Sequence, residues 1–310
     1  MANSPLSKHD NWLQNAWLHE STWRKENELN FDYYYGDQWT AQEMADLKAN
    51  SQPICTLNYV RPLIDMILAM EAERKLDVRV VGREDSDDDI ANLLTHLMKQ
   101  ISDESMEDFK MSNAFRDMII GGRGVISIEP DEDDQGKPTI ISKHIPWEEV
   151  YVDPYYREPD ASDARYIIRT LWLDRDIAIK KWGEDKVNLI LHSETNGFDD
   201  FEGIEANAEL NASGRLNYFD SKYDRVLIAE CQYKDSSGKI RYVQFSGSVY
   251  LYGEEDDTDD NNEPPFETNG FWLIPFTAFR DRAGLPRGIV HMIRSMQDML
   301  NKKTRSLCGI

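Results

Sequence analysis

The stretch from residue 145 to residue 170 constrains the fold more than any other part of the chain. Its three prolines fix φ and remove backbone donors, so no helix can run through it. Residues 150–152 between them have the apolar pattern of a short strand, and a second strand is predicted over 166–171. The stretch is also dense in aromatic residues but contains no obvious catalytic group. We therefore expect a rigid joint between two sheet segments.

Helical patterns dominate the first 120 residues. An amphipathic pattern predicts a helix over 8–29, and Gly36 closes the aromatic connector expected over 31–39. Thr40 and Glu43 form a capping box that begins a short helix. Further helices are predicted from Asn58 onward, over 87–102 and over 106–120. Two glycines end the helix over 106–120. A strand is predicted over 76–81.

Strand patterns dominate after residue 124. Two antiparallel hairpins are predicted, the first from 124–129 and 139–143 and the second from 226–234 and 240–245. Residues 196–221 are polar and are predicted to form a long surface excursion. Further strands are expected over 249–252 and 272–279, and helices over 174–182, 184–191 and 284–307. The predicted fold class is α+β, with N-terminal helices, antiparallel strands and a C-terminal helix.

Charge is distributed unevenly along the 310 residues, a length that suits one large domain or two smaller ones. The net charge of -22 argues against broad binding of nucleic acid through its phosphates. From Arg280 to the end, however, seven basic residues face two acidic ones, so this segment carries +5 and the rest carries -27. Either the two parts face different surroundings, or a basic helix simply packs near acidic loops.

The chain shows no signal for a membrane or a secretory route. Its N-terminus lacks an apolar core, and its longest apolar run is too short to span a bilayer. The three cysteines are scattered, which suits a reducing compartment and gives no metal motif. We expect a soluble protein made in the cytosol.

Motifs for catalysis or metal binding are weak. Residues 131–136 imitate the start of a calcium loop, but the twelfth position is Ser142 instead of the required glutamate. The acidic loop 253–264 has no fixed geometry. Asp160, Glu184 and Lys186 formally match the carboxylates and lysine of metal-dependent nucleases, but the last two open a helix where such a site needs a core strand. We expect no enzyme activity, no metal and no cofactor.

The last helix is the best physical candidate for function. Two interpretations are open: it packs between neighbouring subunits and presents its charges to a polyanion, or it ends a domain with cations placed near its C-terminus for the helix dipole. The predicted apolar, subunit-packing stripe comprises Ile289, Met292, Ile293, Met296 and Leu300. The basic residues that fall wholly or partly off the stripe are Arg294, Lys302, Lys303 and Arg305.

Three segments together resemble the portal proteins of tailed bacteriophages, especially the large portals of short-tailed phages. The first segment is NYVRPLID (58–65) leading to ERKLDVRV (73–80), similar to an early helix entering a strand. The second is FRDMIIGGRGV (115–125) followed by IPWEEVYVDP (145–154), which resembles the wing. The third, GLPRGIVHMIRSMQDMLNK (284–302), resembles the helix that enters the stem.

The resemblance implies a homo-oligomeric ring, usually of twelve copies, at one capsid vertex of the virion. DNA passes through the ring during genome packaging and ejection, and the ring itself is not an enzyme. Implied partners are the terminase motor, capsid or scaffold proteins and tail adaptors, with assembly in the host cytoplasm. Residues 1–283 would form the wing-like α+β domain, and 284–310 the start of the stem helix. The charged residues of that helix would face the DNA channel.

The resemblance also implies parts that this sequence does not contain. In portal proteins the first stem helix is followed by a clip, a second stem helix, a tunnel loop and a crown. These parts would lie beyond residue 310 of this sequence, so we expect a C-terminally truncated form. Two alternatives stay open. One is a metal-dependent nuclease or phosphodiesterase using Asp160, Glu184 and Lys186, and the other is a generic acidic structural adaptor of a phage.

Overall fold

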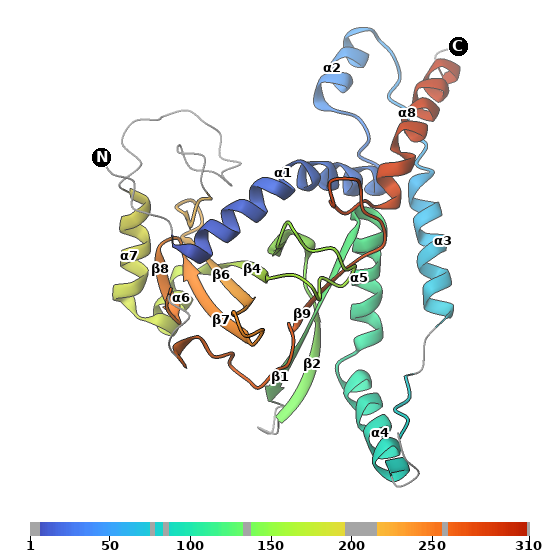
Figure 1. Ribbon diagram of the computed structural model, residues 1–310. Coiled ribbons are helices and arrows are strands. Elements are labelled where there is room, and N and C mark those ends of the chain that lie inside the picture. Colours follow the sequence, from blue (N-terminus) through green and yellow to red (C-terminus); the bar gives the residue numbers. More distant parts are fainter. Residues whose placement is uncertain are drawn as a thin grey trace. The chain divides into compact units, whose positions relative to one another are not determined.

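A computed structural model describes residues 7–74, 78–82, 87–132, 138–195, 216–255 and 260–308 (Figure 1). Contacts group the chain into two compact units. The first unit comprises Met1–Ser21 and Glu148–Trp272, and the second comprises Thr22–Trp147 and Leu273–Ile310. The long helix α1 (Lys8–Tyr35) contributes residues to both units.

The first unit is built on a six-stranded sheet in which every described pair of strands is antiparallel. The strand order is β3-β4-β6-β7-β8, and the short β5 pairs with β6. The strands are β3 (Val150–Val152), β4 (Tyr166–Asp174), β5 (Phe219–Asp220), β6 (Arg225–Lys234), β7 (Ile240–Ser246) and β8 (Val249–Tyr252). The unit also contains α6 (Arg175–Trp182), α7 (Glu184–Thr195) and the 3-10 turn η3 (Asp260–Asn262).

The proline-rich stretch connects two adjacent strands of this sheet. β3 pairs with β4 so that Tyr151 lies opposite Ile168. The Asp153 carboxylate accepts hydrogen bonds from the amides of Tyr155 at 3.0 Å and Arg165 at 3.1 Å. One side chain, that of Asp153, thus accepts hydrogen bonds from two backbone amides of the irregular segment. Both strands predicted in this stretch are confirmed.

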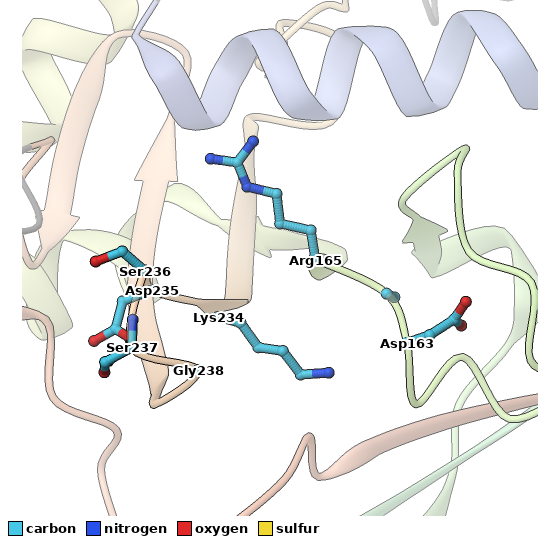
Figure 2. Close-up of a pocket in the computed structure, with 8 residues that line it drawn as sticks. Asp163, Arg165, Lys234, Asp235, Ser236, Ser237 and Gly238 are labelled. Carbon is cyan, nitrogen blue, oxygen red and sulfur yellow. Dashed lines mark hydrogen bonds between the residues drawn. The ribbon is translucent and has the colours of Figure 1, made fainter.

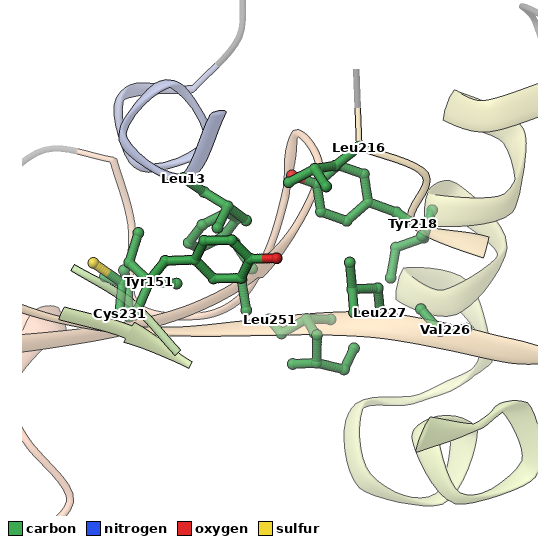
Figure 3. Packing of buried hydrophobic residues seen from close by; sticks show 14 of the residues in the cluster. Leu13, Tyr151, Leu216, Tyr218, Val226, Leu227, Cys231 and Leu251 are labelled. Atoms are coloured by element: carbon green, nitrogen blue, oxygen red, sulfur yellow. The ribbon is translucent and has the colours of Figure 1, made fainter. Parts of the chain in front are cut away.

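Apolar side chains from α1, α6 and α7 pack against the sheet to form the core of the first unit. Figure 3 shows Leu13 reaching from α1 toward the strands. The central strand β6 is buried over most of its length because β4 and β7 flank it. Cys231 on this strand is fully buried, and burial raises the pKa of its thiol.

The second unit combines a small sheet with six helical segments. Its strand order is β2-β1-β9, with both pairs antiparallel. Pro275 lies in β9, at the edge of the sheet, where a missing backbone donor is tolerated. Besides the end of α1, its elements are α2 (Ala41–Ala49), α3 (Val60–Glu73), α4 (Asp88–Glu104), α5 (Glu107–Gly121), β1 (Arg123–Glu132), β2 (Pro138–His144), β9 (Leu273–Thr277) and α8 (Ile289–Cys308). The 3-10 turn η2 (Trp147–Glu149) lies at the division between the units.

The core of the second unit lies where α1, α3, α5 and α8 meet. Its buried residues come from all four helices and are Tyr33, Tyr34, Val60, Ile64, Ile119, Ile120 and Val290. The two tyrosines supply large apolar surfaces and place their hydroxyls at the edge of the core, where each donates to a carboxylate.

Most of the predicted elements are confirmed, including both hairpins and the α+β class. The capping box of Thr40 and Glu43 is present, and Asn58 Oδ1 accepts from the amides of Val60 and Arg61 at the start of α3. Gly36 follows the end of α1 with φ of +97°.

Three predictions about elements are wrong in part. Residues 31–35 of the aromatic connector continue α1, because Tyr33 and Tyr34 pack into the core from helical positions. Residues 78–81 of the predicted strand have no regular structure, and residues 76–77 lie outside the described residues. The last helix begins at Ile289 instead of Gly284, because a loop precedes it. Most of the predicted surface excursion, residues 196–215, also lies outside the described residues.

Candidate functional site

A close contact between backbones fixes the start of helix α8. Gly122 ends α5 in the left-handed conformation, with φ of +106°, as the Gly121-Gly122 pair predicts. A Cβ on Gly122 would lie 2.5 Å from the Arg287 nitrogen, and a Cβ on Gly288 would overlap the Ile120 carbonyl. Because only glycine allows this approach, the end of α5 determines where α8 begins.

The loop that precedes α8 is organised by the carboxylate of Asp281. Its Oδ1 accepts hydrogen bonds from the amides of Ala283 and Leu285, both at 2.9 Å. Its Oδ2 accepts from Nε and Nη2 of Arg287 at 3.1 Å and 2.9 Å. Nη1 of Arg287 in turn pairs with Glu26 of α1. Two hydrogen bonds to one carboxylate oxygen hold the Arg287 guanidinium against Asp281, and its ion pair with Glu26 links the residues just before α8 to α1.

The charge states in this network follow from burial and neighbouring groups. Burial alone would raise the pKa of Asp281, but hydrogen bonds from the Leu285 amide and from Arg287 outweigh it and lower the pKa. Burial alone would lower the pKa of Arg287, but hydrogen bonds to Asp281 and Glu26 outweigh it and raise the pKa. For His291, burial and the charge of Arg287 lower the pKa. At neutral pH Asp281 is therefore ionised, Arg287 is charged and His291 is neutral.

The inner face of α8 is polar over its C-terminal half. Gln297 is 3% exposed, donates to the Leu57 carbonyl at 2.6 Å and accepts from the Tyr59 amide at 3.2 Å. Asn301 is 2% exposed, donates to Gln38 Oε1 at 2.6 Å and accepts from the Leu57 amide at 3.3 Å. Buried amides with several partners permit fewer alternative registers than apolar contacts do. These bonds therefore hold the segment before α3 against a defined part of α8.

A tyrosine from α1 adds a further polar contact to α8. The Tyr33 hydroxyl donates to Asp298 Oδ1 at 2.5 Å. Burial and this hydrogen bond to a carboxylate raise the pKa of Tyr33. Arg294 lies beside them, because its Nη1 donates to Asn30 Oδ1 at 3.2 Å and its guanidinium lies 5.9 Å from the centre of the Tyr33 ring.

The four basic residues predicted to face a DNA channel are placed differently from one another. Arg294 is half-buried and contacts α1, as described above. Lys302 and Lys303 are exposed, and Arg305 is half-buried in the last described turns of α8. The structure therefore brings only the two lysines to an open surface among these four, and their contact with DNA stays a prediction.

The predicted apolar stripe of α8 straddles the boundary between its buried and exposed faces. Ile289 and Ile293 are partly buried and pack against the core of the second unit. Met292, Met296 and Leu300 are 52%, 59% and 42% exposed. Part of the predicted stripe therefore packs within this chain, and part of it is exposed. Its role in packing between subunits stays a prediction.

Sequence reasoning missed the face of α8 that is most buried. That face is centred on Val290, Gln297 and Asn301, about a quarter turn around the helix from the predicted stripe. The spacing of seven and four residues is helical, but two of the three residues are polar. A search for apolar periodicity passes over such a face.

The residues of the nuclease interpretation serve other contacts. The Asp160 carboxylate accepts from the Ser162 amide at 3.0 Å, and this hydrogen bond is the main reason that its pKa is lowered. Lys186 Nζ donates to the Leu251 carbonyl at 2.9 Å. Within the described ranges, no group of three or more His, Cys, Asp and Glu side chains could hold a metal ion. Neither this geometry nor the comparisons below support a nuclease.

An open depression of about 500 Å³ lies beside the turn between β6 and β7 in the first unit (Figure 2). Asp235 and Arg165 are among its lining residues, together with Lys234, which donates to the Ser162 carbonyl at 2.5 Å. Hydrogen bonds from the Ser237 hydroxyl and from Arg241 outweigh burial and lower the pKa of Asp235 to about 2. The turn is therefore held together by its own charges and hydrogen bonds.

No helix among the residues that the structure describes is both long enough and apolar enough to cross a lipid bilayer.

Comparison with known proteins identifies relatives of this chain. The family described as "Phage P22-like portal protein" matches residues 10–238. A protein named "Portal protein" from Helicobacter pylori bacteriophage KHP30 is 20% identical over 270 residues. The matched region is 87% of this chain and 40% of that relative, so the chain spans about two fifths of the relative's length.

Proposed function

We propose, because the chain belongs to the family of phage P22-like portal proteins, that it is a subunit of the ring at one capsid vertex that conducts DNA. The ring would serve as the head-to-tail connector during genome packaging and ejection. In this role the protein is structural and catalyses no reaction, and it resides in the virion after assembly in the host cytoplasm. Its partners would be further copies of itself, the terminase motor, capsid or scaffold proteins and tail adaptors.

The observation that carries this proposal is the architecture of α8 together with the family match. The base of α8 is fixed to α5 by glycines and to α1 by the ion pair of Arg287 with Glu26. Figure 1 shows the C-terminal half of α8 extending beyond the end of α5. A helix that is fixed at its base and projects beyond α5 can contribute to a wall formed by several copies. Lys302 and Lys303 are then available to line that wall.

The charge distribution supports a channel through which DNA slides. A large net negative charge disfavours tight, general binding to phosphates. Two exposed lysines per copy, repeated around a ring, would attract DNA phosphates weakly, and only in the part of the channel where the lysines lie. DNA would be centred there without being held.

The proposal is tested by reversing these charges and measuring association with DNA. The variant carries Lys302→Glu and Lys303→Glu, and its matched control carries Lys180→Glu and Lys181→Glu, an exposed pair in the last turn of α6. Fluorescence anisotropy with labelled duplex DNA is recorded over a series of salt concentrations. We expect weak binding that the α8 variant abolishes and the α6 control retains, because each lost phosphate contact reduces the salt dependence by about one ion. Equal effects of the two pairs, or no binding by the unchanged protein at low salt, would contradict the proposal.

A further inference from the structure

Helix α4 exposes an apolar face that no described residue of its own unit covers. Five large side chains of α4 lie at least two fifths in solvent: Ile90 (61%), Leu93 (68%), Leu94 (42%), Leu97 (48%) and Met98 (44%). In the described part of α4, Ala91 is the one buried residue. A continuous apolar face of this kind marks an interaction surface, whereas single exposed apolar residues need no explanation.

The exposed face of α8 has the same character. Met292, Met296 and Met299 are 52%, 59% and 58% exposed, and Leu300 extends the row. Methionine side chains adapt to a partner's shape, which suits a helix-helix contact. Lys303 lies on the same face, one turn beyond Met299, so the apolar row ends in a positive charge.

The charges around the two faces are complementary. Residues 87–108, which include α4 and the start of α5, contain seven carboxylates and a single lysine. Residues 289–308, which form α8, contain four basic residues and a single carboxylate. Asp89 and Glu104 are exposed near the two ends of α4, so acidic side chains flank its apolar face in either direction of packing. An anionic lipid surface would be repelled by α4, which argues against a membrane as the occupant of this face.

The two faces cannot meet within one molecule. α4 leads into the N-terminal end of α5, while α8 begins against Ile120 and Gly121 at the C-terminal end of α5 (Figure 1). The 15 residues of α5 span about 22 Å at 1.5 Å per residue. A contact between the faces must therefore join two copies of the chain. It pairs different surfaces of the two copies, and such a contact repeats around a closed ring or along an open filament.

We propose that the apolar face of α4 packs against the exposed methionine face of α8 in the neighbouring copy. This inference rests on the proposed function, because it names the surfaces through which copies of the chain associate. Each copy uses α4 on one side and α8 on the other, so both faces become covered throughout the assembly.

A photo-crosslinking experiment tests the contact without changing the native cysteines. Benzoylphenylalanine replaces Leu97 near the middle of α4, and the labelled chain is mixed with 15N-labelled unmodified chain before irradiation. Mass spectrometry should find crosslinks to residues 289–308 of the 15N chain, since the middle of α4 meets the middle of α8 in either packing direction. The same probe at Leu189, which is 57% exposed on α7 in the first unit, should give none of these crosslinks.

Weakening the contact gives a second readout. We expect Leu93→Ser with Leu97→Ser to lower the association constant by roughly tenfold or more, because two half-exposed apolar side chains lose their burial. The control, Ile177→Ser with Leu189→Ser, removes similarly exposed side chains from α6 and α7 and should leave association unchanged. Native mass spectrometry measures both.

The outcomes separate this inference from the function on which it rests. Oligomers that form but crosslink elsewhere, or that are indifferent to the α4 substitutions, would overturn the α4–α8 contact and leave the ring intact. A chain that stays monomeric up to high micromolar concentration would overturn both.

Discussion

Replacing Gly288 by alanine should destabilise the second unit, because the new Cβ would clash with neighbouring backbone atoms. It would overlap the Ile120 carbonyl and lie 2.8 Å from the Gly121 nitrogen. Both neighbours are backbone atoms, so no side-chain rotation relieves the contact. Overpacking in well-packed sites typically costs about 1–3 kcal/mol, and a backbone neighbour places this site at the upper end.

The lower entropy of the unfolded alanine variant offsets part of that cost, by about 0.4–1 kcal/mol. The free energy of unfolding should therefore fall by about 2 kcal/mol. For a domain of the size of the second unit, this corresponds to a fall in melting temperature of about 4–8 °C. Gly270→Ala is the matched control, because a Cβ at Gly270 meets no atom within 4 Å.

Thermal unfolding followed by circular dichroism measures the shift, and hydrogen exchange locates it. The peptide that covers α8 should exchange faster in Gly288→Ala, while β6 and β7 of the first unit should keep their protection. If Gly288→Ala melts like Gly270→Ala and α8 exchanges at the same rate in both, then the close contact does not hold α8 in place.

Three further predictions concern single side chains that form several hydrogen bonds, two in or beside α8 and one in the turn between β6 and β7. Asp281→Asn should lower the free energy of unfolding by about 1–2 kcal/mol at pH 7, because Arg287 loses a charged partner. Since the pKa of Asp281 is lowered in the folded protein, its contribution to stability is lost as the pH falls. The difference in unfolding free energy between the variant and the unchanged protein should therefore shrink when the urea titration is repeated from pH 5 downward. Asp235 contributes stability that is present above its unfolded pKa near 4 and is lost as the pH falls through about 2, so Asp235→Asn should flatten the acid limb of the stability curve over this window. Asn301→Ala leaves the buried side-chain oxygen Oε1 of Gln38 without this donor and should lower the free energy of unfolding by about 1–3 kcal/mol, measured as a lower urea midpoint. An unchanged midpoint would show that the polar face of α8 does not contribute to stability.

Local signals in the sequence predicted much of this fold. The capping box at Thr40, the side-chain cap at Asn58 and the left-handed Gly122 each mark a helix end through contacts within a few residues. The alternation of apolar and polar residues likewise predicted both hairpins, because the paired strands of a hairpin are close together in the sequence. An element that is stabilised by contacts between residues close in sequence can therefore be predicted from that part of the sequence alone.

The remaining features depend on residues far apart in the sequence. The extension of α1 through Tyr33 and Tyr34 is stabilised by packing against α3, α5 and α8, which local propensity does not report. The contact of Gly288 with Ile120 is invisible in either segment alone. The grouping of contacts into two units, with α1 contributing to both, likewise has no local signature.

The last helix was predicted as a helix, but the arrangement of its buried and exposed faces was not predicted. Apolar periodicity identified α8 and its stripe, yet the deepest face contains Gln297 and Asn301. Their burial is favourable only because Leu57, Tyr59 and Gln38 supply partners, and those partners come from a different part of the chain.

In the proposed assembly, this chain is a ring-forming subunit whose α8 helices surround a channel. Single-particle electron microscopy of the purified protein at high concentration tests this most directly. We expect closed rings with an axial opening wide enough for a DNA duplex, with α8 of every copy at the inner wall and Lys302 and Lys303 toward the opening. Separate monomers, open filaments, or rings in which α8 lies on the outer surface would contradict it.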